Sequence, residues 1–510
     1  MTRTPLLQRL LSRLRDETSA PGPSDPGRRR VLLAAGASAA GCAFGSSYGD
    51  LSPTRPRGRV DTARVAVAVV GGGLAGLVAA WRLRQRGVSA TLYEASGRVG
   101  GRAFTSREVF PVRVELGGEF VGGAHRALRA LAAELGVDLV DLGASSRSLS
   151  RAQILLQGTS WTEDQAVSML RPLVPLIARD LAAVGPGPVN WQHHTPGAEA
   201  LDQLSLAGWM ERNGVSGAAR ALLEAAFVSE HGVDADSQSA LPFLWSLGRA
   251  GARERLFAVD DRRFVMRDGS GALARALESR LGPAIQRGNT LVALRSRPDG
   301  RVRCVFDRGS ASLELDAARV VLALPFSQLR RCEIELELPA IKRRAIAELA
   351  HGTGAKVVVG LRGRPWGAAD GATISDGGVY QESWDSSRGL GGDDALLTAY
   401  SGGRTGVRVG ESNPEAQGRR FIDAVDVLLP GTANAFTGRA ARMHWSSARF
   451  FEGSFSVYAP GDVTRIGGSE GFAVGRLHFA GEHTSARARS SMEGAVESGE
   501  RAAAEVLAAR

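Results

Sequence analysis

The first regular pattern of hydrophobic and polar positions is an apolar, β-branched run, followed by a glycine-rich turn and by apolar residues three and four positions apart. The run predicts a buried strand over residues 65–70, and the spacing predicts a helix over residues 77–86. A second apolar run predicts a strand over Ala90–Tyr93, which ends at Glu94. The pattern therefore predicts a βαβ unit.

Patterns of the same two kinds continue along the chain. From residue 124 to about 255 the spacing is helical, in the segments RALRALAAELG, LRPLVPLIARDLAAV and ARALLEAAFVSEHG. Residues 264–281 suggest a glycine turn and a helix, and residues 291–294, 302–306 and 319–325 suggest further strands. An amphipathic helix is predicted from Met492 to about Ala508. The order indicates an α/β nucleotide-binding domain interrupted by a second, largely helical lobe.

The turn of the βαβ unit carries three glycines, Gly71, Gly73 and Gly76. In a dinucleotide-binding turn the first permits the tight bend, the second lets a pyrophosphate approach the backbone, and the third lets helix and strand pack closely. Glu94 follows where a carboxylate can accept hydrogen bonds from ribose hydroxyls. Because the chain has 64 glycines, this spacing alone is weak evidence for a dinucleotide site, and a purely structural turn is the alternative. The strand, the helix and the terminal acid together favour dinucleotide binding.

Further motifs extend this unit. A basic Gly-Gly-Arg ends at Arg102, ELGGEF spans residues 115–120, and LHFAGEHTS and MEGAVESG span residues 477–485 and 492–499. With the first turn they resemble the flavin-containing amine oxidases, which include monoamine, polyamine and L-amino-acid oxidases. The resemblance implies a discontinuous Rossmann-like FAD-binding domain (residues 65–123, 264–335 and 445–510) with an inserted α+β substrate-binding domain (residues 124–263 and 336–444).

The resemblance also implies which residues bind FAD. Glu482 would hydrogen-bond the ribityl or pyrophosphate region, and the helix from Met492 would aim its N-terminus at the flavin N1 and O2. Relatives with covalently attached flavin carry Cys where Ser454 aligns, so FAD should be held non-covalently. The cofactor-binding residues expected are Gly71, Gly73, Leu74, Ala75, Gly76, Glu94, Ala95, Arg102, Gly117, Gly118, Glu119, Phe120, Val292, Glu482, Met492 and Ala495.

One lysine is a candidate catalytic residue. The chain has only two lysines, Lys342 and Lys356, among 63 basic residues, and Lys356 lies inside a predicted strand. An amine on a flexible stem can hold one water in a way that a guanidinium cannot. The resemblance implies that Lys356 holds a water against the flavin N5; a strand-edge lysine without a role is the alternative.

The resemblance implies oxidation of the C–N bond of an amine or L-amino acid to an imine, with oxygen reduced to hydrogen peroxide. Phe455 and Ser491 align with the aromatic cage of monoamine oxidases, so one wall is missing, and Trp445 is a third pocket residue. An amino-acid carboxylate would need a cation, for which Arg487 and Arg489 are candidates. The alternatives are an FAD-dependent desaturase or dehydrogenase with another electron acceptor, and a flavin-binding structural protein.

Composition excludes other classes. The net charge of +10 suggests nucleic acid, but residues 1–64 hold 11 Arg against 5 acids, which leaves +4 for the rest and no basic stripe. The sequence contains no CxxC motif and no Cys/His cluster, so it gives no indication of a metal site. Whether Cys304 and Cys332 pair is left open, as is the oligomeric state, for which a homodimer is one option.

The N-terminus suggests export. Three arginines at residues 28–30 precede the short apolar run VLLAAGASAAG, which is too short to span a bilayer and fits a twin-arginine signal. A linker would follow to residue 64, and the location would be periplasmic or extracellular. The alternatives are a disordered basic N-terminus and, less favoured, a lipoprotein modified at Cys42.

Overall fold

A computed structural model describes residues 60–143, 153–247, 262–367, 371–376 and 378–509. The arginines of the expected export signal and Cys42 lie outside the described residues. Within the described part, no helix combines the length and apolar character needed to cross a bilayer.

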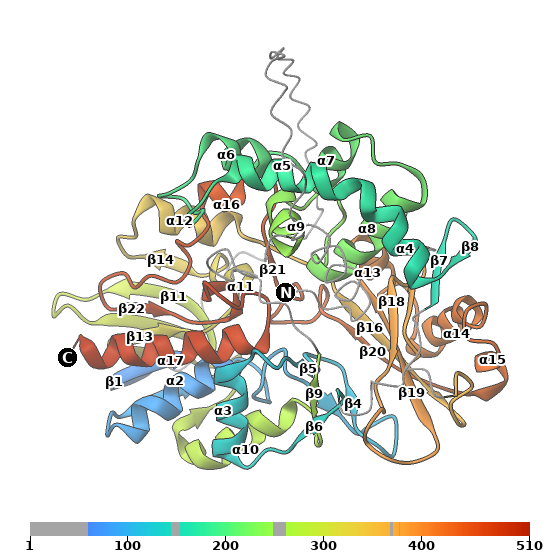
Figure 1. The fold of residues 1–510 in the computed structure, drawn as a ribbon. Coiled ribbons are helices and arrows are strands. Elements are labelled where there is room, and N and C mark those ends of the chain that lie inside the picture. Colours follow the sequence, from blue (N-terminus) through green and yellow to red (C-terminus); the bar gives the residue numbers. More distant parts are fainter. Residues whose placement is uncertain (1–59, 144–152, 248–261, 368–370, 377, 510) are drawn as a thin grey trace.

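The first lobe is built on an eight-stranded sheet, shown on the left of Figure 1. Its central strand β1 (Val60–Val70) runs parallel to β2 (Ala90–Tyr93) and to β13 (Ser312–Leu322). The order is β10-β2-β1-β13-β12-β11-β14, and β22 also pairs with β13. The other strands are β10 (Ile285–Gln286), β11 (Thr290–Ser296), β12 (Val302–Asp307), β14 (Glu333–Glu335) and β22 (Leu477–Phe479).

Two helices from opposite ends of the chain lie side by side against this sheet. They are α2 (Leu74–Gln85) and α17 (Met492–Ala508) (Figure 1). Leu77, Val78 and Val496 are fully buried between them and the sheet. Burying each such side chain contributes about 1.5–3 kcal/mol. The packing therefore holds the C-terminal helix against the first βαβ unit.

Two more helices complete this layer, α3 (Arg126–Leu135) and α10 (Gly271–Leu281). Leu128 and Leu131 of α3 are buried in the same core as α2 and α17. In packing, α3 thus belongs to the nucleotide-binding lobe, although the sequence assigned the chain from residue 124 to the substrate lobe. Near it lies a small sheet of β5 (Phe120–Val121), β9 (Phe264–Met266) and β6 (Leu139–Asp141).

The second lobe, on the right of Figure 1, contains a seven-stranded sheet that α8 (Gly217–His231) contacts, as does α14 (Pro414–Val425). Its strand β16 (Ala355–Leu361), next to the edge strand, is buried along its whole length. In spatial order its strands are β20 (Phe436–His444), β16 (Ala355–Leu361), β19 (Ala395–Ser401), β18 (Glu382–Asp385), β17 (Thr373–Ser375), β7 (Gln153–Leu156) and β8 (Thr159–Trp161).

A group of helices covers the top of both lobes in Figure 1. The predicted helix LRPLVPLIARDLAAV is divided, because Pro172 and Pro175 each begin a new helical segment instead of continuing the old one. The helices are α4 (Glu163–Leu170), α5 (Val174–Val184), α6 (Pro196–Asp202), α7 (Leu206–Arg212), α9 (Ala240–Leu247) and α12 (Ala340–Glu348).

Several boundaries differ from the sequence prediction. β1 begins at Val60, so residues 60–64 form a strand and not a linker, paired with residues 312–316 of β13. α2 begins at Leu74, three residues early, and residues 264–266 form the strand β9 where a turn was expected. Cys304 and Cys332 are both free thiols.

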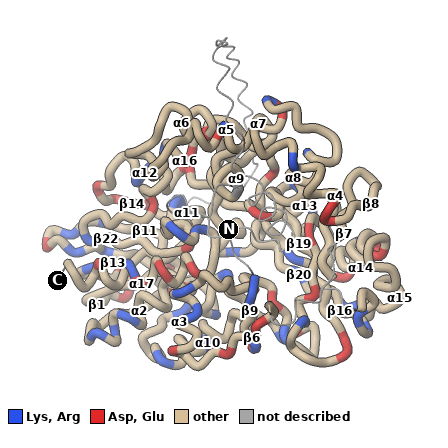
Figure 2. The backbone as a smooth tube through the Cα atoms, viewed as in Figure 1, with Lys and Arg blue, Asp and Glu red and all other residues tan. Residues whose placement is uncertain are grey.

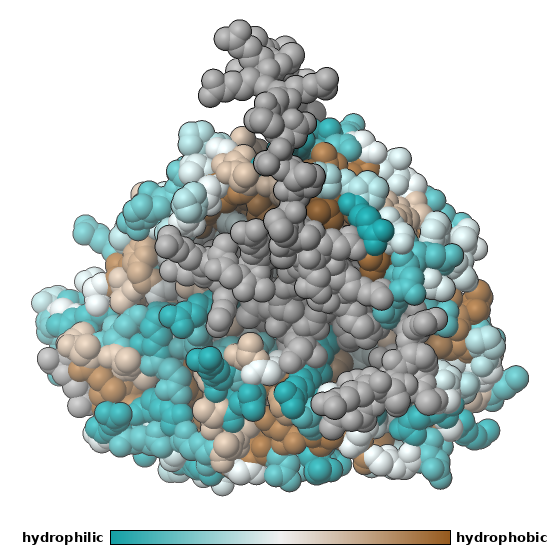
Figure 3. All heavy atoms as spheres, in the orientation of Figure 1, coloured by the Kyte–Doolittle hydropathy of each residue, from teal (hydrophilic) through white to brown (hydrophobic). Residues whose placement is uncertain are grey.

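The surface carries both signs of charge. Figure 2 shows lysines and arginines interspersed with acidic residues over both lobes of the described chain. On the face shown in Figure 3, hydrophilic residues cover much of the described part, and apolar residues gather in separate groups. Such a mixture is ordinary for a globular surface.

Candidate functional site

A cavity of about 830 Å³ lies between the two lobes. Its lining comes from the turn after β1, the segments around residues 117 and 292, strands β16 and β18, and the start of α17. All of the predicted cofactor-binding residues except Gly76 line it, as do the pocket residues Trp445, Phe455 and Ser491. A methyl group on Gly76 would lie 1.9 Å from the Gly71 carbonyl oxygen, so this glycine lets helix and strand approach.

One end of the cavity is the turn from β1 into α2. Gly71 has a positive φ of 105°, and Gly73 is the N-cap of α2 without any side-chain cap. The first N–H groups of the helix therefore face the cavity without a side-chain partner, and Leu74 and Ala75 line it. This arrangement suits a pyrophosphate, since a helix N-terminus attracts anions through N–H groups and the helix dipole.

Glu94 lies beside that turn. Its Oε2 accepts a hydrogen bond from the Gly72 amide at 2.6 Å, and its Oε1 accepts one from the Ser96 amide at 2.8 Å. Ala95 and Val292 line the same cavity. The carboxylate thus braces the glycine turn, and its remaining lone pairs are available to a ribose.

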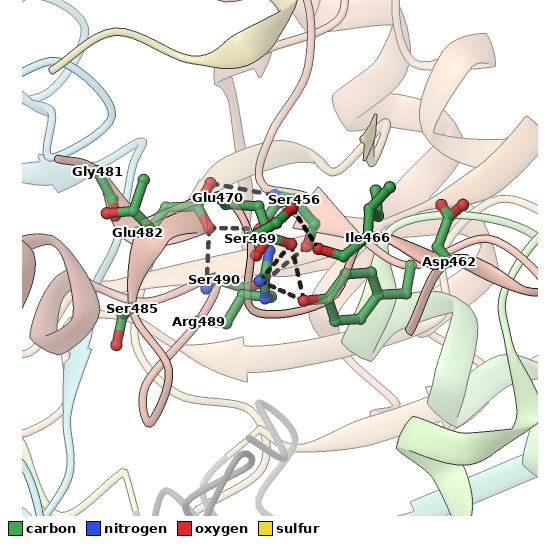
Figure 4. Close-up of polar contacts among 12 residues, drawn as sticks. Ser456, Asp462, Ile466, Ser469, Glu470, Gly481, Glu482, Ser485, Arg489 and Ser490 are labelled. Atoms are coloured by element: carbon green, nitrogen blue, oxygen red, sulfur yellow. Dashed lines mark hydrogen bonds and ion pairs between the residues drawn. The ribbon is translucent and has the colours of Figure 1, made fainter. Parts of the chain in front are cut away.

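Arg102 and Glu482 bring the two ends of the chain together at the cavity wall. Their side chains pair at 3.0 Å, and Arg102 also donates to the Ser454 carbonyl at 2.7 Å. Glu482 accepts further bonds from Ser456 and from the Ser490 amide, drawn in Figure 4. Burial alone would raise the pKa of Glu482, but Arg102 and nearby histidines outweigh it and hold this pKa well below its usual range. Glu482 therefore remains a carboxylate.

The two arginines proposed to bind a substrate carboxylate do not line the cavity. Arg487 is exposed. Arg489 is buried and pairs with Glu470 at 2.8 Å (Figure 4). It also donates to the Tyr458 hydroxyl. The prediction for these residues was wrong, because sequence could not show that Arg489 has a buried acidic partner.

The N-terminus of α17 forms another part of the wall. Ser491 caps the helix by accepting from the Gly494 amide, and Met492 and Ala495 line the cavity. The Ser491 hydroxyl is therefore a helix cap as well as a cavity residue. Glu493 points the other way and accepts from two backbone amides at the start of α3, a role that the sequence did not indicate.

The end of the cavity away from the βαβ turn contains a buried ion pair. Lys356 on β16 lies 2.8 Å from Oε2 of Glu119, and it also donates to the carbonyls of Gly117 at 2.9 Å and Glu115 at 3.2 Å. Trp384 on β18 donates from Nε1 to Oε1 of Glu119 at 3.1 Å. Trp384 lines the cavity wall.

Aromatic rings surround this end. Trp384 lies 5.6 Å from the Phe120 ring and 6.0 Å from the Tyr400 ring, centroid to centroid. Trp445, Phe450, Phe451 and Phe455 also line the cavity. Trp384 and Tyr400 therefore add two rings to this end of the cavity besides Trp445 and Phe455.

Arg262 is a buried basic residue of the cavity that the sequence did not indicate. It lines the cavity, lies over the Phe120 and Trp384 rings, and pairs with Glu382 at 3.3 Å. Burial raises the pKa of Glu382 to about 8, and Arg262 opposes this rise. As one of 61 arginines it carried no signal in the sequence.

Comparison with known proteins decides the family. The model of the family described as flavin containing amine oxidoreductase matches residues 74–507, most of the chain. The chain belongs to this family. As a member it is an FAD-dependent oxidoreductase that oxidises amines.

Individual relatives agree. This amine oxidoreductase is 25% identical over 462 residues to horse amine oxidase [flavin-containing] A, covering 86% of this chain and 84% of the relative. It is also 25% identical to human amine oxidase [flavin-containing] B, covering 86% of each chain. Among solved structures it resembles putrescine oxidase bound to putrescine (TM-score 0.74, 22% identity, 88% and 100% covered) and cyclohexylamine oxidase from Brevibacterium oxydans (0.75, 22%, 87% and 99%), which supports the fold.

The cavity fits FAD. The uncapped N-terminus of α2 suits the pyrophosphate, and Glu94 and Val292 lie where an adenosine would be held. Ser454, which the resemblance aligns with the flavin-bearing cysteine of covalent relatives, lines the cavity, and neither described cysteine does. FAD is therefore held non-covalently. Within the described residues no group of His, Cys, Asp and Glu could hold a metal ion.

Proposed function

We propose that this protein is an amine oxidase that converts a primary amine to an imine and uses oxygen as the electron acceptor, with hydrogen peroxide as product. When bound, FAD supplies the redox chemistry by taking up two electrons and a hydrogen from the carbon next to the nitrogen. The imine then hydrolyses to a carbonyl compound and ammonia. The observation that carries the proposal is a single cavity that joins a dinucleotide-binding turn to a buried aromatic chamber.

The chain's own residues hold and orient the reactants. The anion-binding turn lies at one end, so the flavin ring belongs at the other end, near Gly117, Gly118 and Lys356. There the rings of Trp384 and Tyr400 offer an apolar surface for the body of the amine and exclude water. Holding the amine beside the flavin lowers the activation barrier, because the entropy cost of bringing the two reactants together is already met on binding.

The favoured substrate is an amine without a carboxylate. Arg487 and Arg489 do not line the cavity. Of the arginines that do, Arg102, Arg262 and Arg331 already pair with glutamates, and Arg449 is exposed. A second candidate is an L-amino acid, because Arg262 is still a buried guanidinium at the aromatic end and could exchange one carboxylate for another.

Matched pairs of substrates test this choice. Phenethylamine and L-phenylalanine, or tryptamine and L-tryptophan, differ only in the carboxylate, and peroxide release under air is measured for each. We expect kcat/KM at least tenfold higher for the amine. A preference for the amino acid that is lost in Arg262→Met would instead establish the second candidate. Anaerobic bleaching of the flavin by an amine, without peroxide under air, would favour the dehydrogenase alternative.

We also propose export through the twin-arginine route to the periplasm or the outside of the cell. The support is the arginine run at residues 28–30 followed by a short apolar segment. Replacing Arg28, Arg29 and Arg30 by lysine should retain the protein inside cells of an exporting host. Export of this variant at the normal level would contradict the proposal.

A further inference from the structure

The flavin end of the cavity contains charges whose balance bears on the electron acceptor. Two of them, Lys356 and Glu119, are buried and line the same end as Gly117 and Gly118. Because the interior screens charge weakly, an unbalanced charge here would act strongly on an electron-accepting ring and on oxygen.

Lys356 is fully committed to the protein. An ammonium group has three N–H donors. The three acceptors within reach of the Lys356 Nζ are the Glu119 carboxylate and the carbonyls of Glu115 and Gly117, at 2.8–3.2 Å. In this arrangement the lysine has no N–H left for a water molecule in the cavity.

Glu119 is itself held in place. While its Oε2 faces Lys356, its Oε1 accepts from Trp384 at 3.1 Å, and the Trp384 ring lies 5.4 Å from the lysine nitrogen. The carboxylate is thus fixed between a cation and an indole donor. The pair carries no net charge, although a lysine alone would present one positive charge to the ring.

We propose that Glu119 controls how readily the flavin gains electrons and passes them to oxygen, by cancelling the charge of Lys356 and accepting a hydrogen bond from one of its three N–H donors. A cation near the ring favours gain of electrons by the ring, and it favours the negative charge that develops as electrons pass to oxygen. Glu119 therefore keeps the flavin less oxidising and its reaction with oxygen slower than an unpaired lysine would allow. The inference rests on the proposed function only in that FAD occupies this cavity.

The test compares Glu119→Gln, Lys356→Met and the double variant. The equilibrium constant for flavin reduction is measured by dithionite titration against a reference dye. The Kd of the flavin–sulfite adduct is measured separately, because this adduct is an anion that a nearby cation stabilises. For Glu119→Gln we expect the reduction constant to rise at least tenfold, about 30 mV for a two-electron couple. Sulfite binding should tighten tenfold, and reoxidation by oxygen should be at least threefold faster.

The other variants separate charge from structure. Lys356→Met should shift the reduction constant the opposite way, and the double variant should return to within threefold of the wild type. Trp384→Phe removes a hydrogen bond to Glu119 but no charge, so its reduction constant should also stay within threefold. Equal shifts in Glu119→Gln and Trp384→Phe, or shifts of the same sign in both single charge variants, would overturn the proposal.

None of these three measurements uses an amine. If the protein oxidises no amine but shows the expected pattern of potentials, this proposal stands and the proposed function fails. If it oxidises amines but does not show this pattern, the proposed function stands and this proposal fails. If Glu119→Gln does not retain FAD, Lys356→Met decides, because its reduction constant must still fall tenfold below that of Trp384→Phe.

Discussion

Gly76 of α2 lies directly against the backbone of Gly71. A Cβ atom added at Gly76 would come within 1.9 Å of the Gly71 carbonyl oxygen and within 3.1 Å of the Ala323 side chain. The contact brings the first helix close to the sheet and so directs its N-terminal N–H groups at the cavity.

Gly76→Ala should therefore destabilise the protein. Alanine in a helix interior normally gains about 1 kcal/mol over glycine, but overpacking costs about 1–3 kcal/mol and more where the neighbour is rigid backbone. We expect the overpacking to win, with a net loss of about 2 kcal/mol and weaker FAD retention. Urea unfolding followed by circular dichroism measures the first effect, and flavin content after dialysis the second.

Gly97→Ala is the matched control. Gly97 is exposed, and a Cβ there would meet no atom within 4 Å. Its urea midpoint and flavin content should match those of the wild type. A Gly76→Ala protein as stable as Gly97→Ala would show that the close approach of α2 to β1 is not required.

Glu482 should make stability depend on acid pH. Its pKa is held below the usual range in the folded state, so between that value and about 4.5 the unfolded chain binds more protons. Stability is then fully present above pH 4.5 and is lost as pH falls, by up to about 1.4 kcal/mol per pH unit. Urea midpoints between pH 7 and pH 3 should fall more steeply for the wild type than for Glu482→Gln. Parallel profiles would contradict this role.

Arg489 should matter for folding and not for substrate choice. It pairs with Glu470, whose side chain is almost wholly buried, and removing one partner of a buried pair costs about 3–5 kcal/mol. Arg489→Met should lower the urea midpoint markedly, whereas the exposed Arg487→Ala should not. In both, the ratio of kcat/KM for phenethylamine to that for L-phenylalanine should stay within threefold of the wild type. A selective loss of the amino-acid reaction would restore these arginines to the substrate site.

The elements that local pattern determines could be predicted from sequence. Ala90–Tyr93 and Met492–Ala508 have the predicted bounds, because a strand run and a capped amphipathic helix are specified by neighbouring residues. The motif residues at both ends of the chain could be placed in one site because together they resemble the flavin-containing amine oxidases. The places of Trp384 and Arg262 in the cavity could not be predicted, since they depend on how two distant sheets face each other. The partners of Lys356 and Arg489 are likewise tertiary contacts between residues far apart in sequence.

Lys342, the other lysine, offers a stability test remote from the cavity. It is fully buried on α12, donates to the carbonyls of Ser469 and Glu470 at 2.6 and 2.8 Å, and lies 4.1 Å from the ring centre of Phe479. Burial lowers its pKa to about 7, although nearby Glu470 opposes the shift. Between pH 7 and about 10.5 the unfolded chain therefore binds more protons than the folded one, and stability should rise with pH in this window.

Lys342→Met removes the contribution of this lysine to the rise of stability with pH. From pH 7 to pH 9 the wild type should gain about 2 kcal/mol more stability than Lys342→Met, because each pH unit contributes up to about 1.4 kcal/mol. Arg344→Met, an exposed change on the same helix, should keep the wild-type slope. Urea midpoints at pH 7, 8 and 9 give the three slopes. If Lys342→Met and Arg344→Met have equal slopes, the buried lysine keeps its proton throughout this range, and the two carbonyls and the aromatic ring together outweigh the cost of burying its charge.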